Sequence, residues 1–309
     1  MDNTNQYLPI DKIIIEHNNN FLFDLYTKST KDEEARLVYE NGVDLSINDA
    51  KNLLDYPFLY VEQEKKGVYQ DYYKNYIEQK IIPKNMESFY EDVSKNINNL
   101  FDNPESIENV KEAKVVVTDM VNTILQDDFK VESFVSILSS DYYTHTHSLN
   151  VSVYSLCIGK HMGMDKKLLE ELGISALLHD LGKTKINPEI INKNGKLTDQ
   201  EFKEVQNHPF YGWLLAKKCG ITNTNILAGI RNHHEKIDGT GYPDGLFDKE
   251  IHVFAKIIGV CDVFDALTTK RTYKDSVSTF DTIMMMKKEM SNHLDEKIIN
   301  QFIQILKGE

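Results

Sequence analysis

The chain has 309 residues, of which 41% are hydrophobic and 27% are charged, the composition of an ordinary globular protein. Its formal net charge of −13 is concentrated in residues 1–135, which hold 14 Lys+Arg against 26 Asp+Glu. This acidic balance disfavours nucleic acid, because phosphate backbones need a basic surface, and we expect no nucleic-acid polymer among the partners. Residues 136–309, with 21 basic and 22 acidic side chains, could admit an anionic substrate once metal charge is added.

Membrane, targeting and disulfide signals are missing from the sequence. No apolar run reaches the roughly 18 residues of a membrane-spanning helix. The first twelve residues have neither the basic nor the apolar part of a signal peptide. Cys157, Cys219 and Cys261 show no paired spacing, which argues for a reducing compartment. We therefore predict a cytoplasmic protein without a membrane span.

Residues 1–67 are predicted to form a small mixed α/β module. Short β-favouring runs alternate with Asn- and Gly-containing turns, and Ser46 precedes a short helix as its N-cap. The module holds no catalytic constellation, so we assign it an accessory or regulatory role, with homodimer or protein contacts as candidate interactions. The predicted strands contain Ile13-Ile14-Ile15, Phe21-Leu22-Phe23, Leu37-Val38-Tyr39 and Phe58-Leu59-Tyr60-Val61.

Residues 68–136 change to a helical pattern and form a predicted helical connector. Apolar residues recur with helical spacing in two stripes, one around Tyr72 and the other around Met120. Pro104 breaks the stretch between them, and Ser106 is the expected N-cap of the second helix.

Residues 137–309 form the third predicted domain, which is almost entirely helical. One helix arrives at His179 and Asp180 near its end, and a later helix presents Asp262 and Asp265 at positions i and i+3. Between them, residues 238–245 hold three glycines and a proline, which cannot continue a helix. We therefore predict an α+β protein in which an all-α domain follows the mixed module and the helical connector.

The most informative feature is a set of imidazole and carboxylate side chains inside these apolar, helix-period segments. One buried histidine is usually a satisfied core residue, but a cluster is unfavourable to bury unless it coordinates something. Nitrogen and carboxylate donors together suit divalent iron, manganese or zinc. The set exceeds what one tetrahedral ion could use, so we predict a two-metal site; its members are His147, His179, Asp180, His208, His233, His234 and Asp262.

A carboxylate next to a histidine can do what an imidazole cannot. Its two oxygens can each hold one cation, bridging a pair about 3.5–4 Å apart. A water held between such ions loses a proton near neutral pH and becomes a nucleophile, which fits in-line displacement at phosphorus. Lys183, one helical turn after Asp180, is placed to contact that phosphate, although a lysine at a surface is the plainer alternative.

A series of motifs follows the second half of the chain in a fixed order and covers roughly residues 140–300. The motifs are Tyr143-Thr144, His147-Ser148, His179-Asp180-Leu181-Gly182-Lys183, His208-Pro209, His233-His234-Glu235, Gly241-Tyr242-Pro243, Asp262-Val263-Phe264-Asp265-Ala266-Leu267-Thr268 and Arg271-Thr272-Tyr273-Lys274. Together they resemble the HD-GYP family of metal-dependent phosphodiesterases. That family hydrolyses cyclic dinucleotides, chiefly cyclic di-GMP, to linear pGpG or onward to GMP.

The resemblance implies an HD-type catalytic domain over residues 137–309 that hydrolyses cyclic di-GMP. Asp180 would bridge two divalent ions, iron or manganese, and Lys183 would contact the scissile phosphate. An aromatic face stacks on a base and a guanidinium suits phosphate or a guanine edge. The implied metal ligands are His147, His179, Asp180, His208, His233, His234 and Asp262, and the implied dinucleotide-binding residues are Tyr242, Arg271 and Lys274.

The chain departs from the family pattern at one position. Some members carry a glutamate four residues before the first ligand histidine, where it helps to hold a third metal. Tyr143 stands there, and a tyrosine cannot serve as a carboxylate ligand, although His145 is close by. Since complete conversion to GMP is associated with three metals, we expect two metals and pGpG as the main product.

Two other functions stay open from the sequence alone. The chain could be a non-catalytic signalling protein that binds the dinucleotide or a partner protein. Loss of a ligand or of the Gly-Tyr-Pro loop would favour that function, and the sequence shows neither loss. Alternatively, a di-iron site could make hydrolysis depend on redox state, which metal content and the effect of reduction would reveal.

Overall fold

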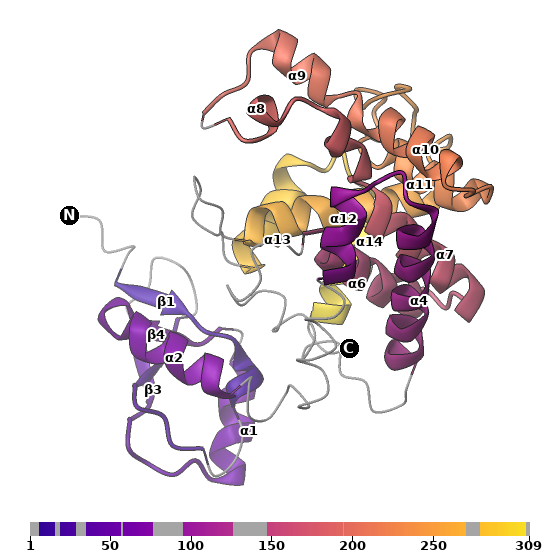
Figure 1. Cartoon of the computed structure of the whole chain (residues 1–309). Coiled ribbons are helices and arrows are strands. Elements are labelled where there is room, and N and C mark those ends of the chain that lie inside the picture. Colours follow the sequence, from indigo (N-terminus) through magenta and orange to yellow (C-terminus); the bar gives the residue numbers. More distant parts are fainter. Residues whose placement is uncertain are drawn as a thin grey trace. The chain divides into compact units, whose positions relative to one another are not determined.

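The computed structural model describes residues 6–15, 19–28, 35–56, 58–76, 95–125, 147–193, 195–269 and 279–306. The chain divides into two compact units, residues 1–84 and 85–309 (Figure 1). The first unit carries a β-sheet and the described part of the second is helical, which confirms the predicted α+β class. Among the described helices, none is both long and apolar enough to cross a membrane.

The first unit is built on a four-stranded antiparallel sheet with the strand order β1-β4-β2-β3. Phe21 and Phe23 are fully buried, and both rings pack edge-on against Tyr72 of α2. The elements are β1 (Tyr7–Pro9), η2 (Lys12–Ile14), β2 (Leu25–Thr27), β3 (Arg36–Tyr39), α1 (Ile47–Asp55), β4 (Tyr60–Glu62), η3 (Gln63–Lys65) and α2 (Lys66–Tyr76).

The sequence predictions for this unit are only partly confirmed. Ser46 does cap α1, because its side chain accepts a hydrogen bond from the backbone N–H of Asp49, and the third and fourth predicted runs contribute to β3 and β4. The first two strand predictions are wrong: residues 12–14 form a 3-10 helix, and residues 21–23 precede β2. Both runs supply buried side chains, so their apolar character reflects the core and not a strand.

The second unit is a helical assembly around α6, which is buried along most of its length from Ser148 to Gly159. The rings of Tyr154, Phe264 and Phe302 join α6, α12 and α14 in one aromatic cluster. The labelled elements are α4 (Ile107–Ile124), α6 (His147–His161), α7 (Lys166–Leu178), η5 (Leu181–Lys185), α8 (Pro188–Ile191), α9 (Asp199–Val205), α10 (His208–Lys218), α11 (Thr224–Asn232), α12 (Val253–Thr268), α13 (Thr279–Glu289) and α14 (Glu296–Leu306).

The stretch predicted as a connector, residues 68–136, is divided between the two units. Helix α2 belongs to the first unit, whereas α4 belongs to the second, where it packs against α7 and α6. Ser106 caps α4 as predicted, accepting a hydrogen bond from the backbone N–H of Asn109 at 3.2 Å. The close packing of α4 on α7 depends on Gly173, where an added Cβ would lie 2.6 Å from the side chain of Val117.

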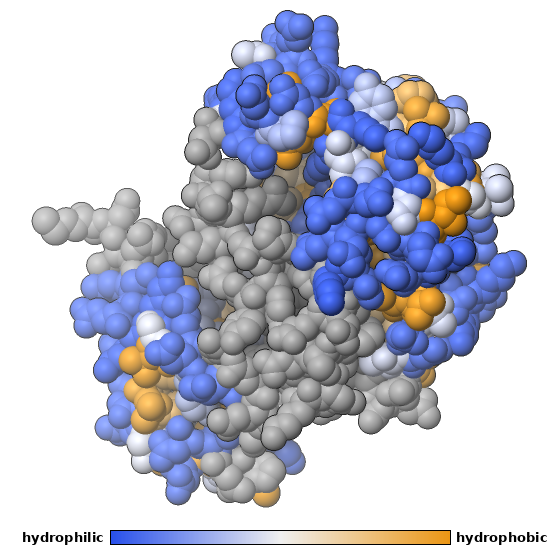
Figure 2. Space-filling model, in the orientation of Figure 1, coloured by the Kyte–Doolittle hydropathy of each residue, from blue (hydrophilic) through white to orange (hydrophobic). Residues whose placement is uncertain are grey.

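The surface of the molecule is mostly polar on the face drawn in Figure 2. Hydrophilic residues cover most of the coloured area, and apolar residues gather there in small separate patches. Exposed apolar side chains, such as Val115 and Leu214, lie on helices that bury their other faces. This distribution fits the amphipathic pattern expected of helices that pack on a core.

The turn η5 and helix α10 meet backbone to backbone at Gly182. A Cβ added at Gly182 would lie 1.9 Å from the carbonyl oxygen of His208 and 2.4 Å from the backbone nitrogen of Gly212. Backbone atoms cannot rotate out of the way as a side chain can, so the two segments would have to separate. This contact therefore sets the distance between Asp180, which immediately precedes η5, and His208 at the start of α10.

Gly182→Ala is expected to lower the free energy of unfolding by about 1–3 kcal/mol or more, because it overpacks a close backbone contact. Urea denaturation of the variant and the parent measures the change. Gly67→Ala in α2 is the control, since an added Cβ there meets nothing within 4 Å. Alanine favours a helix over glycine by roughly 0.5–1 kcal/mol, so this control should be neutral or stabilising. Equal losses in both variants would contradict the steric role of Gly182.

Candidate metal centre

The structure brings all seven predicted metal ligands together at one place in the second unit. Six of them lie at helix ends or directly beside them, where backbone direction changes and side chains from different helices can converge. His147 begins α6, His179 and Asp180 lie between α7 and η5, His208 begins α10, His233 and His234 follow α11, and Asp262 lies within α12.

Asp180 lies at the middle of the cluster, and its two oxygens face different histidines. Oδ2 lies 3.6 Å from Nε2 of His147 and 3.5 Å from Nε2 of His179. Oδ1 lies 3.2 Å from Nε2 of His208 and 4.0 Å from Nε2 of His233. One carboxylate therefore belongs to two donor groups at once.

The two donor groups have the dimensions of ion-binding sites. In each group the donor atoms all lie within 4.8 Å of one another. Donors around one ion with bonds of 2.0–2.2 Å are separated by at most about 4 Å, so small adjustments would close either group on an ion. One group consists of Asp180, His208, His233 and His234, and the other consists of His147, His179 and Asp180.

Three of the imidazoles are held in one tautomer by the backbone. In each, Nδ1 lies 2.7–2.9 Å from the carbonyl oxygen of the residue three positions earlier. A carbonyl can only accept, so Nδ1 carries the proton and the lone pair of Nε2 is directed at the cluster. Metal-binding histidines are commonly oriented in this way. The three pairs are His179 with Ala176, His208 with Val205, and His233 with Ile230.

These inward lone pairs fit a positively charged occupant. Nε2 of His179 is buried and has no hydrogen-bond partner among the described residues. Nε2 of His208 faces Nε2 of His233 at 3.2 Å, an approach of two acceptors. Buried acceptors that lack a donor are unfavourable, and a cation between them removes that cost. Imidazole and carboxylate donors suit a first-row divalent ion, so the side chains present fit a metal centre.

His147 is oriented by Asp265, a carboxylate that the sequence placed on the same helix as Asp262 but to which it assigned no role. Its Nδ1 lies 2.7 Å from Oδ2 of Asp265, and its Nε2 lies 3.0 Å from Oδ1 of Asp262. Asp265 is 1% exposed, and its other oxygen accepts a hydrogen bond from the side chain of Asn150 at 2.7 Å. Asp265 follows Asp262 by one helical turn, so a second carboxylate on a buried helix face was the available signal.

Burial and nearby charges act in opposite directions on the pKa values of the histidines. Burial lowers the pKa of His179 and His233, and it lowers the pKa of His234 to about 3. Burial also acts to lower the pKa of His147, but hydrogen bonds to two carboxylates outweigh it and raise that pKa to about 9. Without metal, one histidine of the cluster is therefore cationic and the others named here are neutral.

Lys183 lies against the central carboxylate. Its Nζ is 2.5 Å from Oδ2 of Asp180 and is partly exposed to solvent. Burial alone would raise the pKa of Asp180, but Lys183 and the neighbouring histidines outweigh burial and hold it well below its usual range. The ammonium group predicted to contact a phosphate is thus within hydrogen-bond reach of the centre.

The predicted substrate residue Tyr242 lies on the cluster. Its ring stacks on the imidazole of His234, with the centroids 4.8 Å apart and the planes at 30°. Its backbone N–H donates to the carbonyl of His234 at 3.2 Å. Gly241 permits this approach, because an added Cβ there would lie 2.3 Å from the backbone nitrogen of Lys236.

A second missed residue, Glu235, holds the loop that carries Tyr242. Its buried carboxylate accepts hydrogen bonds from three successive backbone N–H groups, at 2.7, 3.1 and 3.0 Å. Those groups belong to Asp244, Gly245 and Leu246, and Arg231 adds a bidentate ion pair to the side chain of Asp244. Glu235 stands directly after two predicted ligands, but its partners come from residues nine to eleven positions later, which local sequence does not reveal.

Four residues to which the sequence analysis gave a role in the site or in the number of metals lie outside the described residues. Arg271 and Lys274 were predicted to hold the dinucleotide, and Tyr143 and His145 bear on a third metal. Their roles stay predictions.

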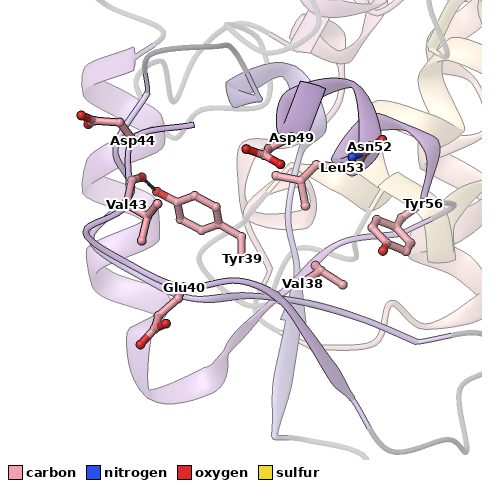
Figure 3. A pocket seen from close by; sticks show the side chains of 9 residues that line it. All are labelled: Val38, Tyr39, Glu40, Val43, Asp44, Asp49, Asn52, Leu53 and Tyr56. Carbon is pink, nitrogen blue, oxygen red and sulfur yellow. Dashed lines mark hydrogen bonds between the residues drawn. The ribbon is translucent and has the colours of Figure 1, made fainter. Parts of the chain in front are cut away.

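A separate pocket of about 310 Å³ lies in the first unit, between β3, the segment that follows it and α1 (Figure 3). In Figure 3 the hydroxyl of Tyr39 reaches the backbone of Val43, to which it donates a hydrogen bond. Three carboxylates, Glu40, Asp44 and Asp49, are among its lining residues, which include no histidine or cysteine. The pocket therefore lacks the imidazole donors of the candidate metal centre.

Comparison with known families gives a match over more than half of the chain. The model of a family described as "HD domain" matches residues 132–298. A cyclic di-GMP phosphodiesterase of Pseudomonas aeruginosa is 35% identical over 191 residues, which cover 62% of this chain and 46% of that protein. A 3′3′-cGAMP-specific phosphodiesterase of Vibrio cholerae is 35% identical over 154 residues, covering 50% of this chain and 33% of that protein.

A solved structure shares the fold. An HDG"Y"P protein from Bdellovibrio bacteriovorus matches with a TM-score of 0.62 and 19% identity, covering 98% of this chain and all of that one. The cluster of histidines and aspartates on a helical assembly defines the class, and the chain belongs to the HD-domain family. Its Gly241-Tyr242-Pro243 loop and the other ordered motifs identify it as a member of the HD-GYP branch. The chain spans half or less of the length of these sequence relatives.

The metal-free chain is expected to be most stable near pH 6.5. Between about pH 6.5 and 9, His147 keeps in the folded state a proton that it loses on unfolding, so stability falls as the pH rises. Below about pH 6.5, His179, His233 and His234 stay neutral in the folded chain but take up protons on unfolding, so stability falls as the pH drops. Urea midpoints of chelator-treated protein test this; a curve that rises steadily across the range would disprove it.

Glu235→Ala is expected to release the loop at residues 242–246, because it leaves three backbone N–H groups without their acceptor. Each unmet buried group costs about 1–3 kcal/mol, so the free energy of unfolding should fall by at least that much. Hydrogen exchange should also speed up at Asp244, Gly245 and Leu246. Glu250→Ala, which removes a single exposed acceptor of the Phe247 N–H, is the control and should change stability by less than about 0.5 kcal/mol. Unchanged exchange in the Glu235 variant would disprove the role.

Proposed function

We propose that this chain is a metal-dependent phosphodiesterase that hydrolyses cyclic di-GMP to linear pGpG. The observation that carries the proposal is the position of Asp180, whose two oxygens face separate sets of histidines. A carboxylate placed in this way is what a pair of cations requires. The family match and the cyclic di-GMP phosphodiesterases among its relatives support the substrate class.

Two divalent ions, iron or manganese, are the proposed cofactors. The proposed ligands on one side of Asp180 are His147 and His179, with Asp262 beside His147. When bound, such ions supply positive charge for a phosphate and a hydrolytic nucleophile at neutral pH. The remaining proposed ligands, on the other side of Asp180, are His208, His233 and His234.

The protein side chains supply orientation and charge in this reaction. The backbone carbonyls fix the tautomer and the direction of three imidazoles, so little reorganisation is needed when substrate binds. Lys183 provides an ammonium group next to Asp180 for a phosphate oxygen. Tyr242 offers a ring face at the edge of the centre, where a base can stack. Arg271 and Lys274 are the further proposed contacts to the dinucleotide.

Two finer points belong to the proposal. Tyr143 in place of a glutamate supports two metals over three and therefore pGpG over GMP as the main product. All three cysteines are buried and none forms a disulfide, which supports action in the reducing cytoplasm. A homodimer or protein partner that contacts the first unit also stays a proposal.

The complete ligand set favours catalysis over a purely binding role. A signalling protein that only binds dinucleotide would not need seven converging donors, three of them imidazoles held in one tautomer. Redox control of a di-iron centre is compatible with the same ligands. Comparing turnover of the iron-loaded protein before and after reduction separates it from simple metal dependence.

Asp180→Ala is expected to reduce bound metal and to lower turnover of cyclic di-GMP at least 100-fold, because one side chain serves both donor groups. The purified protein is metal-quantified, incubated with cyclic di-GMP under reducing conditions, and the products are separated. The parent should form pGpG. Glu105→Gln, which changes a carboxylate on the surface, is the matched control and should retain metal and turnover.

Each contrary result has a defined meaning. Full metal occupancy in the Asp180 variant would disprove bridging. Rapid GMP formation by the parent would indicate a third metal. Turnover of 3′3′-cGAMP but not cyclic di-GMP would change the assigned substrate, and no turnover of either by a metal-loaded parent would disprove the proposed activity.

A further inference from the structure

A line of aromatic rings runs from the metal centre to the surface of the second unit. The rings of His233 and His234 lie 4.2 Å apart, and the His234 ring stacks on Tyr242 at 4.8 Å. The ring of Phe202 on α9 follows, with its centroid 6.5 Å from that of Tyr242. Exposure rises along the line, from 2% for His233 to 48% for Phe202. The line therefore ends on a phenyl ring that is half open to solvent.

Phe202 is carried by a helix that has no fully buried residue. Polar contacts fix the start of α9 instead. Thr198 and Glu201 form a reciprocal capping box, and Glu201 also forms an ion pair with Lys193 at 2.6 Å. A further hydrogen bond joins the backbone N–H of Asn187 to Glu204 at 3.5 Å. The ring is thus held in place without being buried, which leaves its open face available.

We propose that Phe202 and Tyr242 form a stacking site for one purine base of the dinucleotide, an inference that rests on the proposed function. The two ring planes meet at 80°. A base that lies flat on one ring therefore presents its edge to the other, and both arrangements are favourable for aromatic groups. The inner end of the line would hold the phosphate, and the outer end would receive the base.

A single exposed apolar side chain on a protein surface is ordinary and by itself indicates no site. Phe202 differs because its ring contacts Tyr242, which in turn stacks on the proposed ligand His234. Leu214 on α10 is exposed to a similar degree, 43%, and has no ring face. Leu214 is therefore a suitable control for the loss of exposed apolar surface alone.

The stacking proposal also predicts that Phe202 does not discriminate between different bases. Every base has an aromatic face, so stacking contributes affinity with little dependence on the base. Loss of the Phe202 ring should therefore weaken cyclic di-GMP and 3′3′-cGAMP by a similar factor. Choice between the two substrates would come from hydrogen-bonding groups elsewhere in the site.

The test compares Phe202→Ala, Phe202→Trp and Leu214→Ala in the metal-loaded full chain. Steady-state kinetics are measured on cyclic di-GMP, on 3′3′-cGAMP and on methyl p-nitrophenyl phosphate, a diester without a nucleobase. We expect Phe202→Ala to raise KM for cyclic di-GMP about tenfold, within the range measured when a stacking ring is removed. The ratio of kcat/KM for the dinucleotide to that for the base-free diester should fall by a similar factor. Phe202→Trp should restore KM to within about twofold, and Leu214→Ala should match the parent.

Three results would overturn the assignment of Phe202. They are an unchanged KM in Phe202→Ala, an equal rise in Leu214→Ala, and an equal loss on the base-free diester, which would indicate general damage to the site. The parent protein reports separately on the proposed function. Turnover of a cyclic dinucleotide by the parent with no effect of Phe202→Ala would remove only the stacking site, whereas a metal-loaded parent that cleaves no cyclic dinucleotide would remove both proposals.

Discussion

The second unit depends on one constraint: buried imidazole lone pairs point at one another from several helices. The backbone produces this arrangement, because Nδ1 of each of three rings is bound to a carbonyl three residues earlier. Acceptors that converge in this way are unfavourable in a protein interior unless positive charge joins them. The backbone contact at Gly182 and the buried carboxylate of Asp265 help to hold that arrangement.

A second layer of contacts keeps the cluster in shape. Asp265 orients His147 from within the core, and Glu235 fastens the loop that places Tyr242 on His234. Neither carboxylate needs to contact a substrate in order to keep the cluster in shape. Because both are buried and hydrogen-bonded, they fix a helix end and a loop in place. Accurate positioning of metal ligands requires such fixed segments.

The residues of the candidate metal centre were largely predictable from sequence, and the first unit was predictable only in part. Histidines and aspartates inside apolar helical stretches have few explanations besides coordination, so the seven candidates could be named without a structure. The runs at Ile13 and Phe21 show the opposite case: apolar β-favouring residues can lie in a core without forming a strand. Asp265 and Glu235 were missed because their roles are defined by partners distant in the chain or brought close only by folding.

The backbone contact at Gly182 separates the spacing of the segments that carry Asp180 and His208 from the choice of residues at the rim of the site. Since main-chain atoms touch main-chain atoms there, the spacing between the segments that carry Asp180 and His208 is a hard limit and not an average over soft side-chain packing. Residues at the rim, such as Phe202, share no part of that contact. Under the proposed function, a substitution at Phe202 therefore changes the affinity for the dinucleotide while the inner geometry stays as it is.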